Sequence, residues 1–187
     1  ASKKIGDDGK IFSFEPNPRI FGFLRQNILL NKCKNVKLFN FALGSKPTDK
    51  YFSDIYTDES NSVQEDNIGI KVEMKTLDEI IPKEIKINLI KIDVVGYEKF
   101  VFLGARKILE NTLCIHFPAI ANLYKKYNYN YKEIFDLLKQ HRFIVCTVFT
   151  PNILTVLPDD FEPKNGDYIA IKNIDDFLER SNYKLSH

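Results

Sequence analysis

The stretch LIKIDVVGYEKF, residues 89–100, decides the fold. It places one acid, Asp93, inside a run of mostly apolar residues, and Gly96 follows three positions later. Such a run predicts a buried strand, and burying a carboxylate without a partner is costly. We therefore expect Asp93 at the end of a strand, where it holds an ammonium group, takes a proton, binds a metal or accepts hydrogen bonds from backbone amides.

The bulk composition fits one globular domain spanning residues 1–187. Hydrophobic residues make up 44% of the chain and charged residues 28%, which is enough to bury a core. The net charge of +2 is too small to predict nucleic-acid binding, and no apolar run reaches the roughly 18 residues of a membrane span. Cys33, Cys114 and Cys146 lack the spacing of metal ligands. We expect reduced thiols, no bound metal and a cytoplasmic location.

Strand and helix signals alternate between residues 10 and 120, and the strands are nearly continuous apolar runs. This pattern predicts an α/β fold with a parallel sheet covered on both faces. The final two strand signals suit an antiparallel edge, and two segments between residues 45 and 75 suit a hairpin. Residues 97–111 read as one helix. The strands are expected at residues 10–15, 36–43, 87–95, 112–120, 142–149 and 167–173.

Two side chains besides Asp93 lie near predicted strand ends. Glu15 ends the first strand, where an acid either accepts hydrogen bonds from a ribose diol or favours the start of the next helix. The two readings are equally supported by position. His116 lies within CIHFP, where a catalytic base and a core histidine are both open, and no acid partner can be identified from sequence.

The segment YKKYNYNYK, residues 124–132, interleaves basic and aromatic residues. Such a segment can stack on nucleic-acid bases. The simpler reading is a solvated loop before a helix, and we expect no nucleic-acid partner.

Four blocks occur together in order: GKIFSFEPNPRIFGFLRQNILLN, NVKLFNFALGS, TLDEII and INLIKIDVVGYEKFVFLGARKILEN. Together they resemble the FkbM family of S-adenosylmethionine-dependent methyltransferases over about residues 9–111. The resemblance implies a Rossmann-like class I methyltransferase sheet, mostly parallel with an antiparallel C-terminal hairpin. It also implies S-adenosylmethionine as cofactor and O-methylation of a sugar or other small-molecule acceptor.

The same resemblance assigns roles to particular residues. Glu15 would bind the cofactor ribose, and Asp93 would lie at the methionine end near the acceptor. His116 joins Asp93 as a candidate catalytic residue, since a base that removes the acceptor's proton would help the transfer. The remaining cofactor-binding candidates are Phe14, Pro16, Asn17, Ala42 and Leu43.

Three features depart from the family pattern. The opening strand with its glycine-rich loop is absent, so the first strand of the sheet is expected to be missing. That absence would leave a gap, bring the neighbouring strands together, or require a strand from a homo-oligomer. Val95 and His116 stand where the family tends to carry acids. These departures support an alternative, a catalytically inactive or truncated α/β module that binds a partner chain.

Overall fold

The computed structural model describes residues 1–55, 61–150, 152–158 and 160–186. The contacts of the chain fall into two compact units, residues 1–76 and residues 77–187. Each unit is described by itself, and the expectation of a single domain over residues 1–187 stays a prediction.

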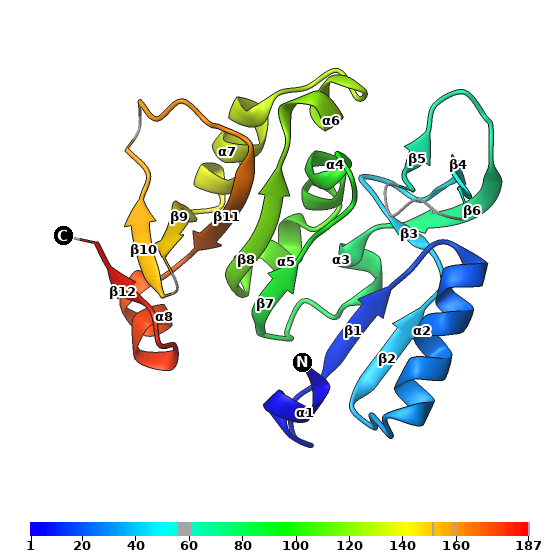
Figure 1. Ribbon diagram of the computed structural model, residues 1–187, viewed down its shortest axis with the longest axis horizontal. Helices are drawn as coiled ribbons and strands as arrows, with labels where there is room; N and C mark the ends of the chain where they lie inside the picture. The colour runs from blue at the N-terminus through cyan, green and yellow to red at the C-terminus, as the bar shows by residue number, and fades with distance from the viewer. Residues whose placement is uncertain (56–60, 151, 159, 187) are drawn as a thin grey trace. The chain divides into compact units, whose positions relative to one another are not determined.

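The first unit begins with the short helix α1 (Ser2–Ile5) and a parallel strand pair. Strand β1 (Ile11–Phe14) pairs with β2 (Val36–Phe39) in the register Ile11 to Val36. Helix α2 (Pro18–Leu30) connects the two strands, as a parallel crossover requires (Figure 1). Asn17 caps α2 and Pro18 occupies its first turn, as the sequence predicts.

A four-stranded sheet completes the first unit. Its strands are β3 (Ala42–Leu43), β4 (Thr48–Phe52), β5 (Val63–Gln64) and β6 (Ile70–Lys75), in the order β3-β6-β4-β5. The antiparallel pairing of β4 with β6 confirms the predicted hairpin partners. Part of the first hairpin segment, at Tyr56, lies outside the described residues.

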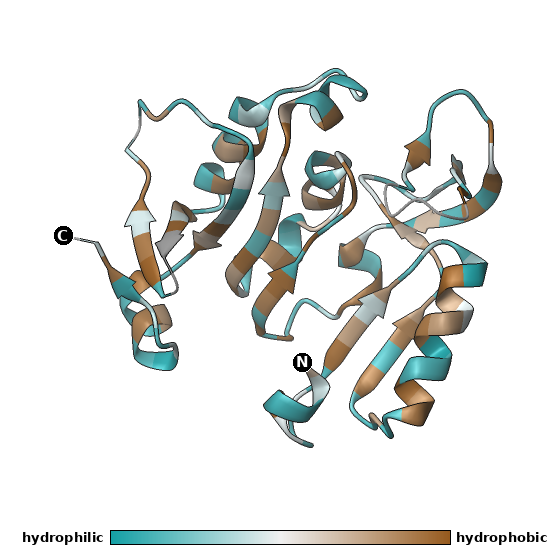
Figure 2. Cartoon of the chain, in the orientation of Figure 1, coloured by the Kyte–Doolittle hydropathy of each residue, from teal (hydrophilic) through white to brown (hydrophobic). Residues whose placement is uncertain are grey.

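The second unit contains a six-stranded sheet in the order β12-β10-β9-β11-β8-β7. The strands are β7 (Ile87–Lys91), β8 (Thr112–Ala119), β9 (Ile144–Thr150), β10 (Ile153–Val156), β11 (Gly166–Ile171) and β12 (Lys184–Leu185). Figure 2 shows hydrophobic residues along most of β7 and β8.

The expectation of a mostly parallel sheet with an antiparallel C-terminal hairpin is met in part. Strands β7 and β8 are parallel, as are β10 and β12, and β9 and β11 pair antiparallel as expected. The antiparallel part is larger than expected, because β8, β11, β9 and β10 run antiparallel to one another in turn. Strand β11 lies inside the sheet rather than at its edge, because it pairs with β8 on one side and β9 on the other (Figure 1). Short connections such as the one between β9 and β10 favour this arrangement, since parallel neighbours need long crossovers.

Strands β1 and β7 each have one pairing partner in the described part of the chain, β2 and β8 respectively. The arrangements expected for a missing first strand stay predictions.

The predicted single helix over residues 97–111 is two helices, α4 (Glu98–Leu103) and α5 (Arg106–Glu110). Asp78, in the short helix α3 (Leu77–Ile80), explains the break. Its backbone N–H donates to the Gly104 carbonyl, and its carboxylate accepts the N–H groups of Lys107 and Ile108 at 3.0 Å. In a continuous helix those N–H groups would bond to the carbonyls four residues earlier.

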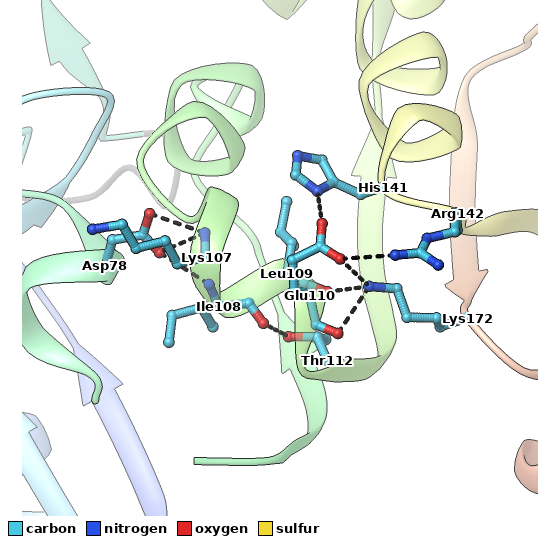
Figure 3. Close-up of polar contacts among 9 residues, drawn as sticks. All are labelled: Asp78, Lys107, Ile108, Leu109, Glu110, Thr112, His141, Arg142 and Lys172. Atoms are coloured by element: carbon cyan, nitrogen blue, oxygen red, sulfur yellow. Dashed lines mark hydrogen bonds and ion pairs between the residues drawn. The ribbon is translucent and has the colours of Figure 1, made fainter. Parts of the chain in front are cut away.

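Charged side chains contact the C-terminal end of α5 (Figure 3). The Lys172 ammonium donates to the carbonyl of Leu109 at 2.7 Å and to that of Glu110 at 3.1 Å. The Glu110 carboxylate contacts His141 at 2.7 Å and Arg142 at 3.5 Å. Because a cation at a helix C-terminus satisfies carbonyls that lack intrahelical partners, this five-residue helix is fixed at both ends.

The core of the second unit lies around β8. Phe117 is fully buried and contacts Phe102 of α4, and Phe135 of α7 (Tyr131–Gln140) at right angles. On the opposite face, Cys114 and Cys146 join a cluster covered by α8 (Ile174–Arg180). Both are free thiols, and burial raises the pKa of Cys114 to about 12.

The segment at residues 124–132 contains the predicted loop before α7, with exposed lysines and asparagines, but three of its tyrosines are not solvated. Tyr124 belongs to helix α6 (Ala121–Lys125). The side chains of Tyr124, Tyr127 and Tyr129 are buried. Tyr124 and Tyr129 stack with ring centroids 4.6 Å apart. These three rings belong to the core, so the buried tyrosines of this segment serve packing.

No helix in the described ranges is both long and apolar enough to cross a lipid bilayer.

We expect Asp78→Ala to lower the free energy of unfolding by about 1 kcal/mol, because it leaves two N–H groups of α5 without their acceptor. Urea denaturation followed by circular dichroism measures this change. The matched control is Asp136→Ala on the exposed face of α7, which should change the free energy by no more than about 0.5 kcal/mol. Equal effects from the two substitutions would contradict the capping role of Asp78.

Candidate functional site

Glu15 lies directly beyond the carboxyl end of β1. Its backbone N–H continues the parallel ladder by donating to the Phe39 carbonyl at 3.1 Å. One oxygen of its carboxylate, Oε1, accepts the N–H of Asn17 at 2.8 Å. Partial burial raises the pKa of Glu15, and the Asn17 hydrogen bond opposes that rise. The side chain is therefore a half-buried strand-end acid in a fixed orientation.

Asn17 is the N-cap residue of α2. Its side-chain oxygen accepts the N–H groups of Arg19 at 2.9 Å and Ile20 at 3.3 Å, and its Nδ2 donates to Asp54 at 2.8 Å. The residue is only 1% exposed. Asn17 is thus committed to holding the start of α2, and Glu15 contributes to the same helix start by accepting the Asn17 N–H through one carboxylate oxygen.

The other cofactor-binding candidates surround Glu15 in different ways. Phe14 stacks on Phe39 with centroids 4.9 Å apart and is tilted against Phe41 at 5.8 Å. The Pro16 carbonyl accepts a hydrogen bond from the Asn40 side chain at 3.1 Å, as does that of Glu15 at 2.8 Å. Ala42 is buried and Leu43 half-buried in β3, which runs parallel to β6. The first unit therefore has an aromatic cluster at the end of β1, at the position where Glu15 follows Phe14 in the chain.

Asp93 is exposed rather than buried within a strand. Strand β7 ends at Lys91, and the Asp93 side chain is 66% exposed with its Oδ2 3.2 Å from the Lys91 ammonium. The costly burial suggested by the surrounding apolar run does not occur. Among the described residues, its carboxylate is not held by backbone amides, so the purely structural explanation for this acid is not supported.

A strained turn follows Asp93. The Tyr97 N–H donates to the Val94 carbonyl at 3.2 Å, and both central residues have positive φ, 51° at Val95 and 92° at Gly96. Positive φ is characteristic of type I′ turns and is a genuine outlier for a β-branched residue. A side chain at Gly96 would place Cβ 2.7 Å from the Leu123 carbonyl oxygen, so glycine is required there.

Glu98, at the start of α4, holds this turn from inside the protein. It is 1% exposed, and its Oε1 accepts the N–H groups of Val94 at 3.4 Å and Gly96 at 3.3 Å. Its Oε2 lies 3.4 Å from the Tyr129 hydroxyl, which also donates to the Gly96 carbonyl at 2.6 Å. Burial raises the pKa of Glu98, and the nearby Asp93 charge adds to that rise.

His116 has an acid partner that sequence reasoning did not find. Its Nε2 lies 3.7 Å from Oδ1 of Asp167, which comes from β11. The His116 side chain is 33% exposed, and its register partner on β7 is Lys91, the residue that contacts Asp93. His116, Asp167 and Asp93 therefore gather at one end of the sheet. No group of metal-ligating side chains forms in the described ranges.

The sequence profile described as the methyltransferase FkbM domain matches residues 1–145. The chain belongs to the FkbM methyltransferase family. A search of curated proteins finds no match.

A solved FkbM methyltransferase shares the fold. The crystal structure of methyltransferase FkbM from Methylobacillus flagellatus matches with a TM-score of 0.50 and 14% sequence identity. The match covers 87% of this chain and 36% of that one, so the chain spans about a third of the other protein's length. The likeness supports a mixed α/β fold of the FkbM type.

Family membership was predictable from the four ordered blocks, whereas Glu98 and Asp167 were not identified as site residues. Glu98 looked like an ordinary acid at a helix start, because the sequence does not show that its side chain is buried. Asp167 is distant from His116 along the chain, and only the pairing of β11 with β8 brings them together. For Glu98, the signal available in the sequence of this FkbM chain was its spacing from Asp93 and Gly96.

The raised pKa of Glu98 predicts a pH dependence of stability. A carboxyl group whose pKa is higher in the folded state stabilises less as pH rises above its ordinary value of 4.5. The free energy of unfolding of the wild type, relative to Glu98→Gln, should therefore fall as pH rises from about 4 and then level off. Thermal unfolding of both proteins across this range tests the prediction. A difference that does not change with pH would contradict it.

Proposed function

We propose that this FkbM-family protein is an S-adenosylmethionine-dependent methyltransferase that methylates an oxygen of a sugar or other small metabolite. The observation that carries the proposal is the family match over residues 1–145, which includes both strand-end acids. The orientation of each acid within its own unit supports this assignment.

Glu15 fits the ribose of the cofactor. Its carboxylate is fixed by the Asn17 N–H at one oxygen, and an ionised carboxylate has further acceptor sites for a diol. The stacked rings of Phe14 and Phe39 offer an apolar surface of the kind that small-molecule sites present around a few polar groups. Strand-end acids of parallel strands bind ribose hydroxyls in dinucleotide folds.

Asp93 fits the ammonium group of the methionine end. The carboxylate already contacts one ammonium group, that of Lys91, and it is exposed at the end of β7. A ligand ammonium would therefore exchange with or join an existing ion pair, and no buried charge would need to be created. The carboxyl ends of parallel strands are where ligands bind in open α/β sheets.

His116 is the base that we assign to the acceptor hydroxyl. When bound, S-adenosylmethionine supplies a methyl group activated by its positively charged sulfur. The sulfur–methyl bond would break as the acceptor oxygen bonds to the methyl carbon, with S-adenosylhomocysteine as the leaving group, and His116 would take the proton of the acceptor hydroxyl. The Asp167 carboxylate lies 3.7 Å from the His116 Nε2. The main task of the protein is alignment, because transfer depends on near-attack geometry.

We expect Glu15→Ala to weaken binding of S-adenosylhomocysteine by about tenfold to a hundredfold, since it removes hydrogen bonds to a charged acceptor. Isothermal titration calorimetry on the full-length protein measures the change. Glu65→Ala is the matched control, because Glu65 is an exposed acid of the same unit paired with Lys50. Unchanged affinity in Glu15→Ala would remove the ribose assignment.

A second ligand separates the two acids. 5′-Methylthioadenosine keeps the adenine and ribose but has no amino-acid end. Asp93→Ala should weaken S-adenosylhomocysteine about tenfold and leave 5′-methylthioadenosine unchanged, whereas Glu15→Ala should weaken both. Competition titrations with the two ligands provide the measurement. If Asp93→Ala affects both ligands equally, Asp93 does not bind the methionine end.

A further inference from the structure

Glu98 is a buried acid with no direct part in the proposed reaction. Its side chain is enclosed by the turn after β7, by Tyr129 and by its own helix α4. Burying a carboxyl group is costly unless its oxygens are hydrogen-bonded. Here the two oxygens face two backbone N–H groups and one hydroxyl. The buried acid therefore stabilises the four-residue turn Val94–Tyr97.

That turn is strained and is held from several directions. Val95 is β-branched and has φ of 51°, a conformation that costs on the order of 1–3 kcal/mol and persists only when the surroundings impose it. The surroundings are the Glu98 carboxyl group, the Tyr129 hydroxyl on the Gly96 carbonyl at 2.6 Å, and the Leu123 backbone against Gly96. Such strain is concentrated at ligand sites and catalytic sites.

The strained turn begins one residue after Asp93. The direction in which β7 leaves the sheet and enters this turn decides where the Asp93 carboxylate is presented. Lys91 contacts that carboxylate from the strand side, and Val94 begins the held turn on the other side. We propose that Glu98 is a positioning residue, whose buried carboxyl group holds the Val94–Gly96 backbone so that Asp93 faces the cofactor's amino-acid end. This inference rests on the proposed function.

Two substitutions of nearly equal size separate the hydrogen bonds of Glu98 from its volume. Glu98→Gln keeps an acceptor oxygen for the N–H groups of Val94 and Gly96. Glu98→Met fills the same space with a side chain that accepts only weakly. The measurement is the affinity of the full-length protein for S-adenosylhomocysteine and for 5′-methylthioadenosine, below the unfolding temperature of each variant.

We expect Glu98→Met to weaken S-adenosylhomocysteine about tenfold and to leave 5′-methylthioadenosine unchanged. Glu98→Gln should remain within about twofold of the wild type for both ligands. A residue with a purely structural role would not change the ratio of the two affinities. The proposal is overturned if folded Glu98→Met keeps the wild-type ratio, or if Glu98→Gln loses as much as Glu98→Met.

Tyr129→Phe provides a second variant in case Glu98→Met does not fold. It removes the hydroxyl that donates to the Gly96 carbonyl and keeps the ring that stacks on Tyr124. We expect the same selective loss of S-adenosylhomocysteine, smaller in size, and an unchanged affinity ratio would refute the positioning role. Failure of the wild type to bind either ligand is a distinct result. It would reject the proposed function, and it would also reject the proposal that the turn positions Asp93 for a ligand.

Discussion

Strand β8 is the element on which the second unit depends, because it is paired along both edges and packed on both faces. Its edges pair with β7 and β11, so most of its backbone groups have partners within the sheet. One face contributes Phe117 to the aromatic contacts with α4 and α7, and the other contributes Cys114 to the cluster under α8. The direction of β7, and hence the place of Asp93, follows from this strand.

The register around β8 explains why its candidate site residues meet at one end. Lys91 of β7 and Ile169 of β11 are both register partners of His116. Asp167 lies two residues from Ile169 along β11 and therefore points to the same face of the sheet. A shift of one residue in either pairing would turn these side chains to the opposite face. The geometry of His116 thus depends on the same hydrogen bonds that build the core.

Glu15 in the first unit and Glu98 in the second are both acids removed from water, but they differ in burial and in hydrogen-bond partners. Glu15 is half-buried, has one backbone N–H as partner and follows Phe14, which stacks on Phe39, in the chain. Glu98 is almost fully buried and directs its oxygens inward at a turn and at Tyr129. Desolvation raises the pKa of both. Their positions suit different tasks, because Glu15 remains accessible to a ligand and Glu98 does not.

Much of the secondary structure could be predicted from the sequence, because local signals determine it. Apolar runs located β1, β2, β7, β8, β9 and β11, and Asn17 with Pro18 marked the start of α2. The ordered blocks also identified the family, since they combine turn, cap and strand signals at fixed spacing.

Only the tertiary structure decided the features that depend on partners distant along the chain. Asp78 divides residues 97–111 into two helices by accepting N–H groups about 30 residues away. The antiparallel neighbours of β8 bring Asp167 to His116, and the packing of Tyr129 against α4 buries Glu98. A sequence pattern reports which side chains prefer burial, but hydrogen-bond partners and strand order depend on how the whole chain satisfies its buried polar groups.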